Sequence, residues 1–252
     1  MPRFCIALVL CSLLAAVPAL ADTAAGVTLA ASPQAIAIDS LYDGMDLTVT
    51  GTIPAASQVV VRLVGEPTTV HMKEKGKVFG LLWMNLAKVT FENAPKVFLV
   101  AASPETSGET LAHLGVPGLA DRIKVTTKDG ATSALVAEFL KYQKAENLYR
   151  EQAGEVTLTA DAGETRTFRA VLHIPSRLSP GAYTIEAIAV KNGVVAGQGA
   201  TAMTASFVGG PAFLADIAFG HGALYGTLAS VIAILGGLVI SQLFRGQKSS
   251  AH

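Results

Sequence analysis

Two long apolar segments stand near the ends of this chain, and between them apolar and polar residues alternate over short stretches. The first segment runs from Phe4 to Val17, follows Arg3 and closes on the Ala-Leu-Ala of residues 19–21. The second runs from Ile217 to Phe244, 28 residues in which only His221 can carry a charge near neutral pH. A segment of this length can cross a bilayer as a helix. The first has instead the charge, length and small-residue ending of a cleavable signal peptide.

These two segments predict the topology of the protein. We expect a signal peptide over residues 1–21, a transmembrane helix over 222–244 and a cytoplasmic tail over 245–252. Arg245 and Lys248 follow the expected span directly, and basic residues that flank a span stay in the cytoplasm. The expected location is therefore the bacterial inner membrane, with a single pass, a periplasmic N-terminal domain and a cytoplasmic C-terminus.

The middle of the chain predicts strands, because short β-branched runs are separated by turn residues. The runs cover residues 35–38, 47–53, 59–64, 78–84, 88–91, 96–101, 156–159, 167–174, 181–190 and 200–208. They predict a mainly β fold of immunoglobulin-like antiparallel sandwich type, in one domain or two, with one amphipathic helix and the C-terminal span. The expected division is a β-sandwich region over 22–104, a loop and amphipathic helix region over 105–153, a second β region over 154–210, and a hinge and juxtamembrane segment over 211–221.

Three local patterns add detail to this fold. Residues 133–152 carry apolar side chains at helical spacing up to a stop at Gly154, so we expect a helix there that packs on the sheet. The dipeptide Asn192-Gly193 predicts a tight hairpin turn. Tyr183 follows a loop that runs from a proline to a glycine, and we expect its hydroxyl to tie down a corner of the sandwich.

Cysteine content and charge exclude several classes of partner and chemistry. Cys5 and Cys11 are the only cysteines and both fall in the expected signal peptide, so the exported part would have no disulfide or cysteine-bound metal. Without Arg3, Arg245 and Lys248, 16 basic side chains remain outside against 19 acidic ones, a net charge of −3. This balance argues against nucleic acid as a partner and against adhesion to anionic lipid.

A search for catalytic and metal-binding motifs finds none, so we expect no enzymatic activity, no catalytic residue, no cofactor and no metal site. The chain lacks a Gly-x-Ser-x-Gly elbow, a His-Glu-x-x-His motif and a phosphate-binding glycine loop. None of its five histidines is four residues from another. A site assembled from distant residues, around His71 or His173, stays an open alternative.

A basic stretch in the first β region has two interpretations. His71, Lys73, Lys75 and Lys77 would share one face of an extended ribbon, where they could bind an anion. We favour the other interpretation, a solvated hairpin tip over residues 74–77 whose charges keep an exposed edge from aggregating.

The expected transmembrane helix carries small residues four positions apart. Small side chains at this spacing let two helix backbones approach closely, which favours association with another helix in the membrane. The residues that we expect to pack against a partner helix are Gly222, Gly226, Ser230, Ala229, Ala233, Gly237 and Ser241.

Three groups of motifs resemble a known family. They are the run from Val89 to Pro95, the run from Glu146 to Gln152, and the closing segments Ile217–His221, Leu224–Gly226 and Phe244-Arg245. In this order they are similar to the Alph_Pro_TM family, uncharacterised single-anchor transmembrane proteins of alphaproteobacteria. The family has no established catalytic residues to carry over. Its genes often lie beside permeases that resemble sulfite exporters, which implies a role associated with a transporter.

Three functions stay open on these grounds. We favour a non-enzymatic, membrane-anchored periplasmic β-sandwich protein that is an accessory or assembly partner of an integral membrane protein such as a small-anion permease. The alternative is a periplasmic ligand-binding or chaperone-like module that uses a sheet edge and is tethered by its helix. The third is an enzyme with a site built from distant residues. The expected partners are the lipid bilayer and an integral membrane transporter, and no nucleic acid.

Overall fold

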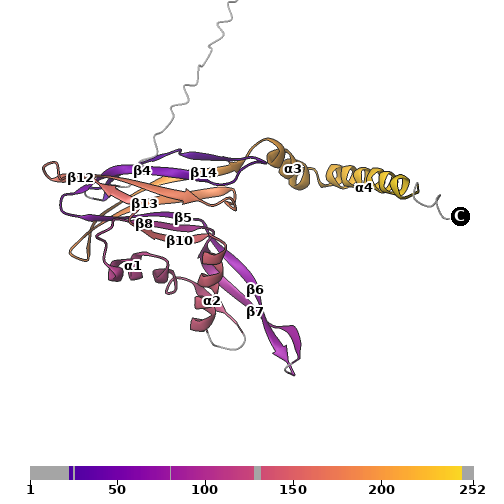
Figure 1. The fold of residues 1–252 in the computed structure, drawn as a ribbon, viewed down its shortest axis with the longest axis horizontal. Helices are drawn as coiled ribbons and strands as arrows, with labels where there is room; N and C mark the ends of the chain where they lie inside the picture. The colour runs from indigo at the N-terminus through magenta and orange to yellow at the C-terminus, as the bar shows by residue number, and fades with distance from the viewer. Residues whose placement is uncertain (1–22, 25, 80, 128–131, 246–252) are drawn as a thin grey trace, which may run out of the picture.

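The computed structural model describes residues 23–24, 26–79, 81–127 and 132–245, and it consists mainly of strands. Two sheets lie one above the other, a long hairpin projects from them, and two helices lead away from one end (Figure 1). The prediction of a mainly β, largely antiparallel fold with a C-terminal apolar helix is confirmed. The expected signal peptide and residues 246–252 of the expected tail lie outside the described residues.

The larger sheet has seven strands in the order β1-β14-β13-β5-β8-β10, with β3 also paired to β14. Its pairs are antiparallel except β10 with β8 and β3 with β14. The strands are β1 (Thr23–Ala24), β3 (Ala35–Ile38), β5 (Gln58–Gly65), β8 (Phe98–Ala102), β10 (Tyr149–Ala153), β13 (Gly181–Lys191) and β14 (Val194–Phe207).

The smaller sheet has four antiparallel strands in the order β11-β12-β4-β2. Alternate residues of β12 are buried in the core between the two sheets, namely Phe168, Ala170, Leu172 and Ile174. This period of two is the one that the sequence shows over residues 167–174. The strands are β2 (Thr28–Ser32), β4 (Met45–Pro54), β11 (Val156–Leu158) and β12 (Thr165–Ile174).

Strands from the two β regions of the sequence are neighbours in space. β4 pairs with β12, and β5 pairs with β13, so residues before 104 and after 154 build one core. The expected regions 22–104 and 154–210 are therefore consecutive in the sequence but fold into one shared core.

β5 is buried on both faces because a second layer covers the outside of the larger sheet. Val59, Val61 and Leu63 belong to the core between the sheets, whereas Val60 belongs to a second apolar cluster on the outer face. This explains why residues 59–64 read as a continuous apolar run with one charge, Arg62, rather than as an alternation.

The second layer contains a helix shorter than the predicted one. The amide of Leu148 donates to the carbonyl of Gln143, and that of Asn147 donates to Lys144. With Asn147 in the left-handed region (φ 59°), these bonds form a Schellman end. The helix prediction is therefore wrong from residue 146 on, where the chain turns into β10. The helical elements of this layer are α1 (Gly108–Leu114), the short 3-10 helix η1 (Pro117–Leu119) and α2 (Thr132–Ala145).

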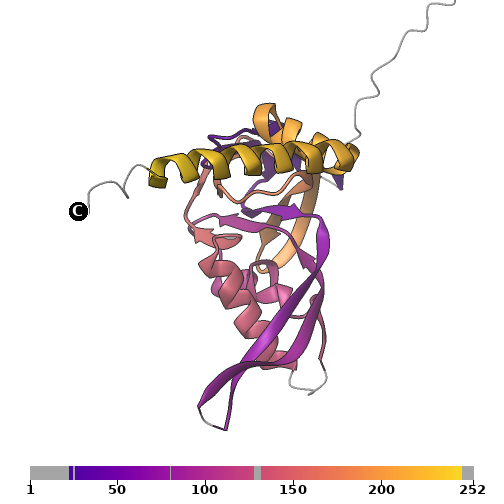
Figure 2. The ribbon, with the colours of Figure 1, turned by 90° about the vertical axis from the view of Figure 1, so that its right-hand side faces the viewer.

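A three-stranded sheet of β6 (Pro67–Val78), β7 (Leu82–Pro95) and β9 (Lys124–Thr126) projects from the body (Figure 2). Val78 and Leu82 are the last pair before its turn, so the prediction of one strand over 78–84 is wrong. The expected tip over 74–77 is wrong as well, because these residues pair inside the ribbon, Lys75 opposite Asn85. The reason is register: the pairing near the base decides where the turn falls, and local turn propensity does not report it.

An aromatic cluster fixes the base of this hairpin to the second layer. Phe91 of β7 stacks on Phe139 of α2 with ring centroids 4.4 Å apart, and Tyr149 meets Phe139 edge-on at 6.2 Å. The Tyr149 hydroxyl donates to the carbonyl of Pro95 at 2.7 Å. Burial raises the pKa of Tyr149, so this hydroxyl stays protonated and remains a donor.

Two turn predictions are confirmed. Asn192 and Gly193 both have positive φ, 54° and 77°, as a two-residue hairpin turn requires. The Tyr183 hydroxyl donates to the carbonyl of Ser179 and ties down the start of β13. Burial, with a smaller contribution from the Glu66 carboxylate, raises the pKa of Tyr183 to about 12.

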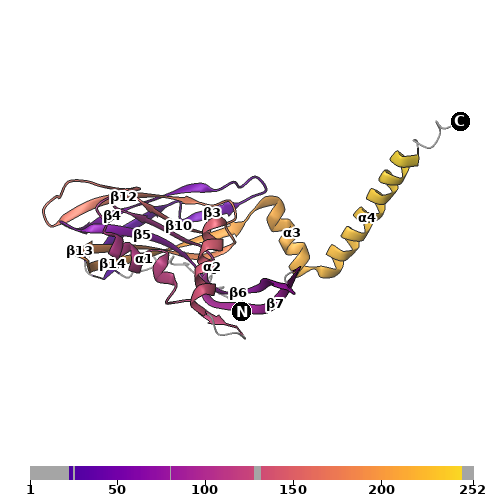
Figure 3. The ribbon, with the colours of Figure 1, turned by 60° about the horizontal axis from the view of Figure 1, so that its bottom comes forward.

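The segment expected to be a hinge, 211–221, lies in a helix up to Gly220. α3 (Gly209–Gly220) begins two residues after β14 and ends at His221, whose φ of −134° and ψ of 57° are not helical. α4 (Gly222–Arg245) starts at the next residue and leads away from the sheets (Figure 3). The chain therefore bends at a single residue between two helices.

Candidate functional site

The feature that points most directly to a function is α4. Its apolar stretch Gly222–Phe244 has 23 residues, and none of it is buried against the rest of the described protein. The exposed fraction of its large side chains ranges from 44% for Leu228 to 70% for Leu243. A bilayer accepts such a helix, because all its backbone hydrogen bonds close within the segment and its side chains are apolar. α4 can therefore anchor the protein in a membrane.

The seven small residues predicted to pack against another helix lie on one face of α4. At ~3.6 residues per turn they fall within an arc of about 120°. An added Cβ at Gly222, Gly226 or Gly237 would meet no atom of the described residues within 4 Å apart from the nearby backbone of α4 itself, so this face is open. Its role in helix packing stays a prediction. The opposite face carries bulky side chains, among them Leu224, Leu228, Val231, Leu235 and Val239, and toward the end of the helix Ile240 and Phe244 also fall within the arc of the small residues.

Two hydroxyl groups of α4, those of Thr227 and Ser230, are satisfied inside the helix. Ser230 Oγ donates to the carbonyl of Gly226 at 2.8 Å, and Thr227 Oγ1 donates to that of Ala223 at 2.9 Å. Such bonds remove the penalty of placing a free hydroxyl in hydrocarbon. Ser230 therefore adds little bulk and no unmet polar group to the small face.

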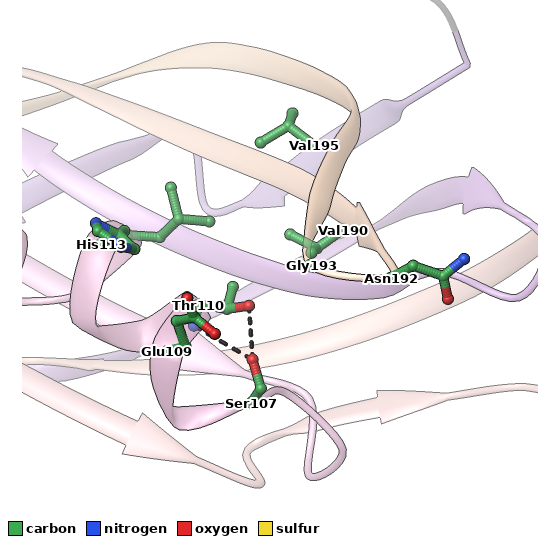
Figure 4. Close-up of a pocket in the computed structure, with 9 residues that line it drawn as sticks. Ser107, Glu109, Thr110, His113, Val190, Asn192, Gly193 and Val195 are labelled. Atoms are coloured by element: carbon green, nitrogen blue, oxygen red, sulfur yellow. Dashed lines mark hydrogen bonds between the residues drawn. The ribbon is translucent and has the colours of Figure 1, made fainter.

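A pocket of about 450 Å³ between α1 and the β13–β14 turn is a second candidate (Figure 4). α1 and the residue before it supply the polar side chains, and the β13–β14 hairpin supplies mainly apolar ones (Figure 4). The lining residues are Ser107, Glu109, Thr110, His113, Leu114, Val190, Asn192, Gly193 and Val195.

The hydroxyls of this pocket hold α1 in place. Ser107 Oγ accepts from the amide of Thr110 at 3.2 Å as the helix cap, and it lies 2.9 Å from Thr110 Oγ1. Glu109 and His113 also line the pocket, one helical turn apart, and their side chains are available to bind a ligand. A carboxylate and an imidazole can bind a small polar molecule. The described lining residues do not form the nucleophile and base pair that acyl transfer needs.

Sequence reasoning did not single out this pocket. His113 was only one of the scattered histidines. The single local signal was the Ser-x-x-Thr pattern that caps α1, and it says nothing of the β13–β14 turn. The pocket exists because the fold brings residues as far apart in the sequence as Ser107 and Val195 to one place.

His71 and His173 were the candidates for a site built from residues distant in the sequence. Each of them instead lies within hydrogen-bond distance of a side chain on the neighbouring strand. His173 Nδ1 lies 2.8 Å from Asp46 Oδ1 across β12 and β4, and both side chains are more than half exposed, 52% and 66%. His71 Nδ1 lies 3.1 Å from Thr90 Oγ1 across β6 and β7. Within the described ranges, no group of three or more His, Cys, Asp or Glu side chains is placed to hold a metal ion.

Comparison with known proteins identifies a family. The profile described as "Putative transmembrane protein (Alph_Pro_TM)" matches residues 26–246. The match begins before β2 and runs through the last residue of α4, so it includes both sheets, the hairpin and the anchor. No curated protein matches the chain.

Two solved structures show distant similarity. The N-terminal domain of the Streptococcus gordonii adhesin Sgo0707 is 9% identical, with a TM-score of 0.25; the match covers 73% of this chain and 33% of that one. A family 123 glycoside hydrolase from Clostridium perfringens is 10% identical, with a TM-score of 0.22; the match covers 72% of this chain and 27% of that one. This chain thus spans about a third or less of either protein.

Proposed function

Because the chain belongs to the Alph_Pro_TM family of transmembrane proteins, we propose that it is a membrane-anchored accessory protein that assembles through α4 with an integral membrane partner. The observation that carries the proposal is the open face of small residues along a helix that nothing in the described protein covers. A mere tether needs length and apolarity, and it does not need small residues gathered on one side. We further propose that the protein is not an enzyme.

The partner that we favour is a transporter such as a small-anion permease. Support comes from the family resemblance, which implies a role beside permeases, and from the chemistry of the helix face. In lipid, helices associate through close backbone contact, and small residues permit it. A polytopic transporter offers many helix faces at the depth of α4.

We propose that the sheets lie in the periplasm and the C-terminus in the cytoplasm of a bacterial inner membrane. The support is the position of Arg245 and Lys248 after the span. A reporter that is active only in the cytoplasm should be active when fused after His252 and inactive when inserted at Gly209-Gly210. The reverse pattern would invert the orientation and contradict this proposal.

The assembly proposal is tested by filling the small face of α4. In the variant Gly226→Leu/Gly237→Leu, bulk replaces open space, so α4 still forms and spans while a close helix contact is lost. We expect recovery of an integral membrane partner, measured by affinity purification in mild detergent and mass spectrometry, to fall by roughly tenfold or more. The matched control is Val231→Leu/Val239→Leu, which adds bulk to the opposite face and should recover the partner like the wild type.

The alternative function, a tethered ligand-binding module, is favoured by the pocket between α1 and the β13–β14 turn. The same variants separate the two proposals, because a tether tolerates Gly226→Leu/Gly237→Leu. Purification of the wild-type protein alone, as a monomer, would contradict the assembly proposal and leave the tethered module.

A further inference from the structure

The hairpin of β6 and β7 ends in exposed apolar side chains. Phe79 is 92% exposed, Leu81 85%, Leu82 63% and Met84 52%. They sit together at the turn and in the last pairs before it, where Val78 pairs with Leu82 and Gly76 with Met84. A soluble protein rarely gathers this much exposed apolar surface at the tip of a projecting element unless the surface meets a partner.

The two faces of the hairpin differ in chemistry. Paired residues of antiparallel strands share a face, and β6 keeps its alternation from Val70 to the turn. One face starts at the base with Val70 and Phe91, packed in the second apolar cluster, and continues past Glu74 to the exposed Met84 and Leu82. The apolar face therefore runs beyond the support of α2 to the tip.

The opposite face is basic. His71, Lys73, Lys75 and Lys77 occupy alternate positions of β6, and Lys88 pairs with Lys73. From His71 to Lys88 the ribbon has four lysines against one glutamate. The net charge of −3 that argues against anionic lipid belongs to the whole exported part, whereas this hairpin concentrates positive charge beside an apolar tip.

The hairpin and the anchor leave the body in different directions. In Figure 1 the hairpin points downward and to the right, whereas α3 and α4 extend to the right at the level of the sheets; Figure 2 shows the tip below and α4 above. α3 also exposes large apolar side chains, Phe213, Leu214 and Phe219. A bilayer that receives α4 can also receive the tip at a separate place, because α4 is joined to the rest of the protein through the bend at His221.

We propose that the tip of the β6–β7 hairpin enters the interface of the bilayer that α4 spans. Phe79, Leu81, Leu82 and Met84 would enter the boundary between headgroups and acyl chains, and Lys73, Lys75 and Lys88 would meet anionic headgroups. An apolar edge combined with a basic face is the composition that binds such interfaces. The hairpin is thus a second attachment point that limits the rotation of the sheets about the bend at His221. This inference rests on α4 as an anchor and not on a protein partner.

Trp83, the only tryptophan of the chain, lies in β7 next to Leu82 and makes the proposal testable without labels. The full chain is reconstituted in phosphatidylcholine vesicles, with and without phosphatidylglycerol, whose acyl chains carry bromine. We expect a blue-shifted emission that the brominated lipid quenches. The matched control is Trp83→Phe/Val194→Trp, which moves the tryptophan to a side chain that is 69% exposed at the end of β14 remote from α3. Its emission should be quenched severalfold less.

Two further variants assign the contact to its parts. Phe79→Ser/Leu81→Ser should reduce the quenching of Trp83 severalfold in both kinds of vesicle, and Val194→Ser should leave it unchanged. Lys73→Glu/Lys75→Glu/Lys88→Glu should reduce the quenching mainly in vesicles with phosphatidylglycerol, and added salt should mimic it. All these side chains are exposed, so thermal unfolding should match the wild type. No quenching at Trp83, equal quenching at residue 194, or unchanged quenching in the serine variant would overturn the proposal. The vesicles contain no other protein, so failure of the assembly proposal would not affect this result.

Discussion

Replacing Arg62 by alanine should lower the free energy of unfolding by about 2–3 kcal/mol, because it removes a buried cation and leaves a partly exposed carboxylate without its charged hydrogen bonds. Arg62 is on the outer face of β5, and its side chain is only 8% exposed. Its guanidinium donates two hydrogen bonds to Glu186 Oε2 on β13 and one to the carbonyl of Leu114, 3.3 Å away at the end of α1. It also lies 5.9 Å from the ring centre of Phe98. Alanine would leave the Glu186 carboxylate, which is 30% exposed, without its cation.

The measurement is chemical unfolding of the full chain in mild detergent, followed by far-ultraviolet circular dichroism. Two variants make the result specific. Arg62→Met/Glu186→Leu replaces the pair by apolar side chains and should recover most of the loss, because it leaves no unpaired charge. Glu66→Ala breaks an ion pair with Lys96 that is half exposed on the carboxylate side, and should cost about 1 kcal/mol or less. An Arg62→Ala loss no larger than that of Glu66→Ala would contradict the prediction.

Replacing Phe139 by alanine should cost about 3–5 kcal/mol, as is typical of removing a buried aromatic side chain. Phe139 is 2% exposed and touches two other aromatic rings, Phe91 of the hairpin and Tyr149 of β10. It therefore joins the base of the hairpin to the larger sheet. Its loss removes the stacking partner of Phe91 and leaves a cavity in the second apolar cluster.

The loss should be local, and hydrogen exchange can show this. We expect the amides of β6 and β7 to exchange faster in Phe139→Ala, while those of β4 and β12 keep the wild-type order of protection. Tyr142→Ala is the control on the same helix, because Tyr142 is 47% exposed and should change neither stability nor exchange by much. Equal acceleration in β12 would mean that the hairpin and the sandwich unfold as one unit, against this prediction. A loosened hairpin should also weaken the lipid quenching of Trp83.

Two attachment points would restrict how the sheets move relative to the bilayer. α4 is connected to α3 through one non-helical residue, His221, and α3 to β14 through another, Val208, so by itself α4 leaves the body free to tilt. The hairpin is held by its aromatic base and projects from the body in another direction than α4. Together they would hold the sheets at a defined angle to the bilayer, which suits a protein that must meet the exported surface of a membrane partner.

Several features of this protein could be predicted because their causes are local. The span 222–244 is set by the transfer of an uncharged apolar segment into hydrocarbon, which depends on the segment alone. The turn at Asn192-Gly193 follows from backbone freedom at positive φ, and the strands around Ile174 and Ile185 follow from their alternation. The end of α2 also had a local signal, because asparagine is favoured at the left-handed position that Asn147 occupies. An analysis of apolar spacing alone does not detect this signal.

Other features depended on contacts between distant parts of the chain, and only the tertiary structure decided them. The sequence by itself determined the anchor, the strands and their turns, because bilayer transfer and backbone preference act within a segment. The pairing of β4 with β12, the register that puts Phe79 rather than Lys75 near the hairpin tip, and the burial of Arg62 required the folded protein. Each depends on which surfaces meet after folding, and strand register and burial change with the partner even when the local sequence does not.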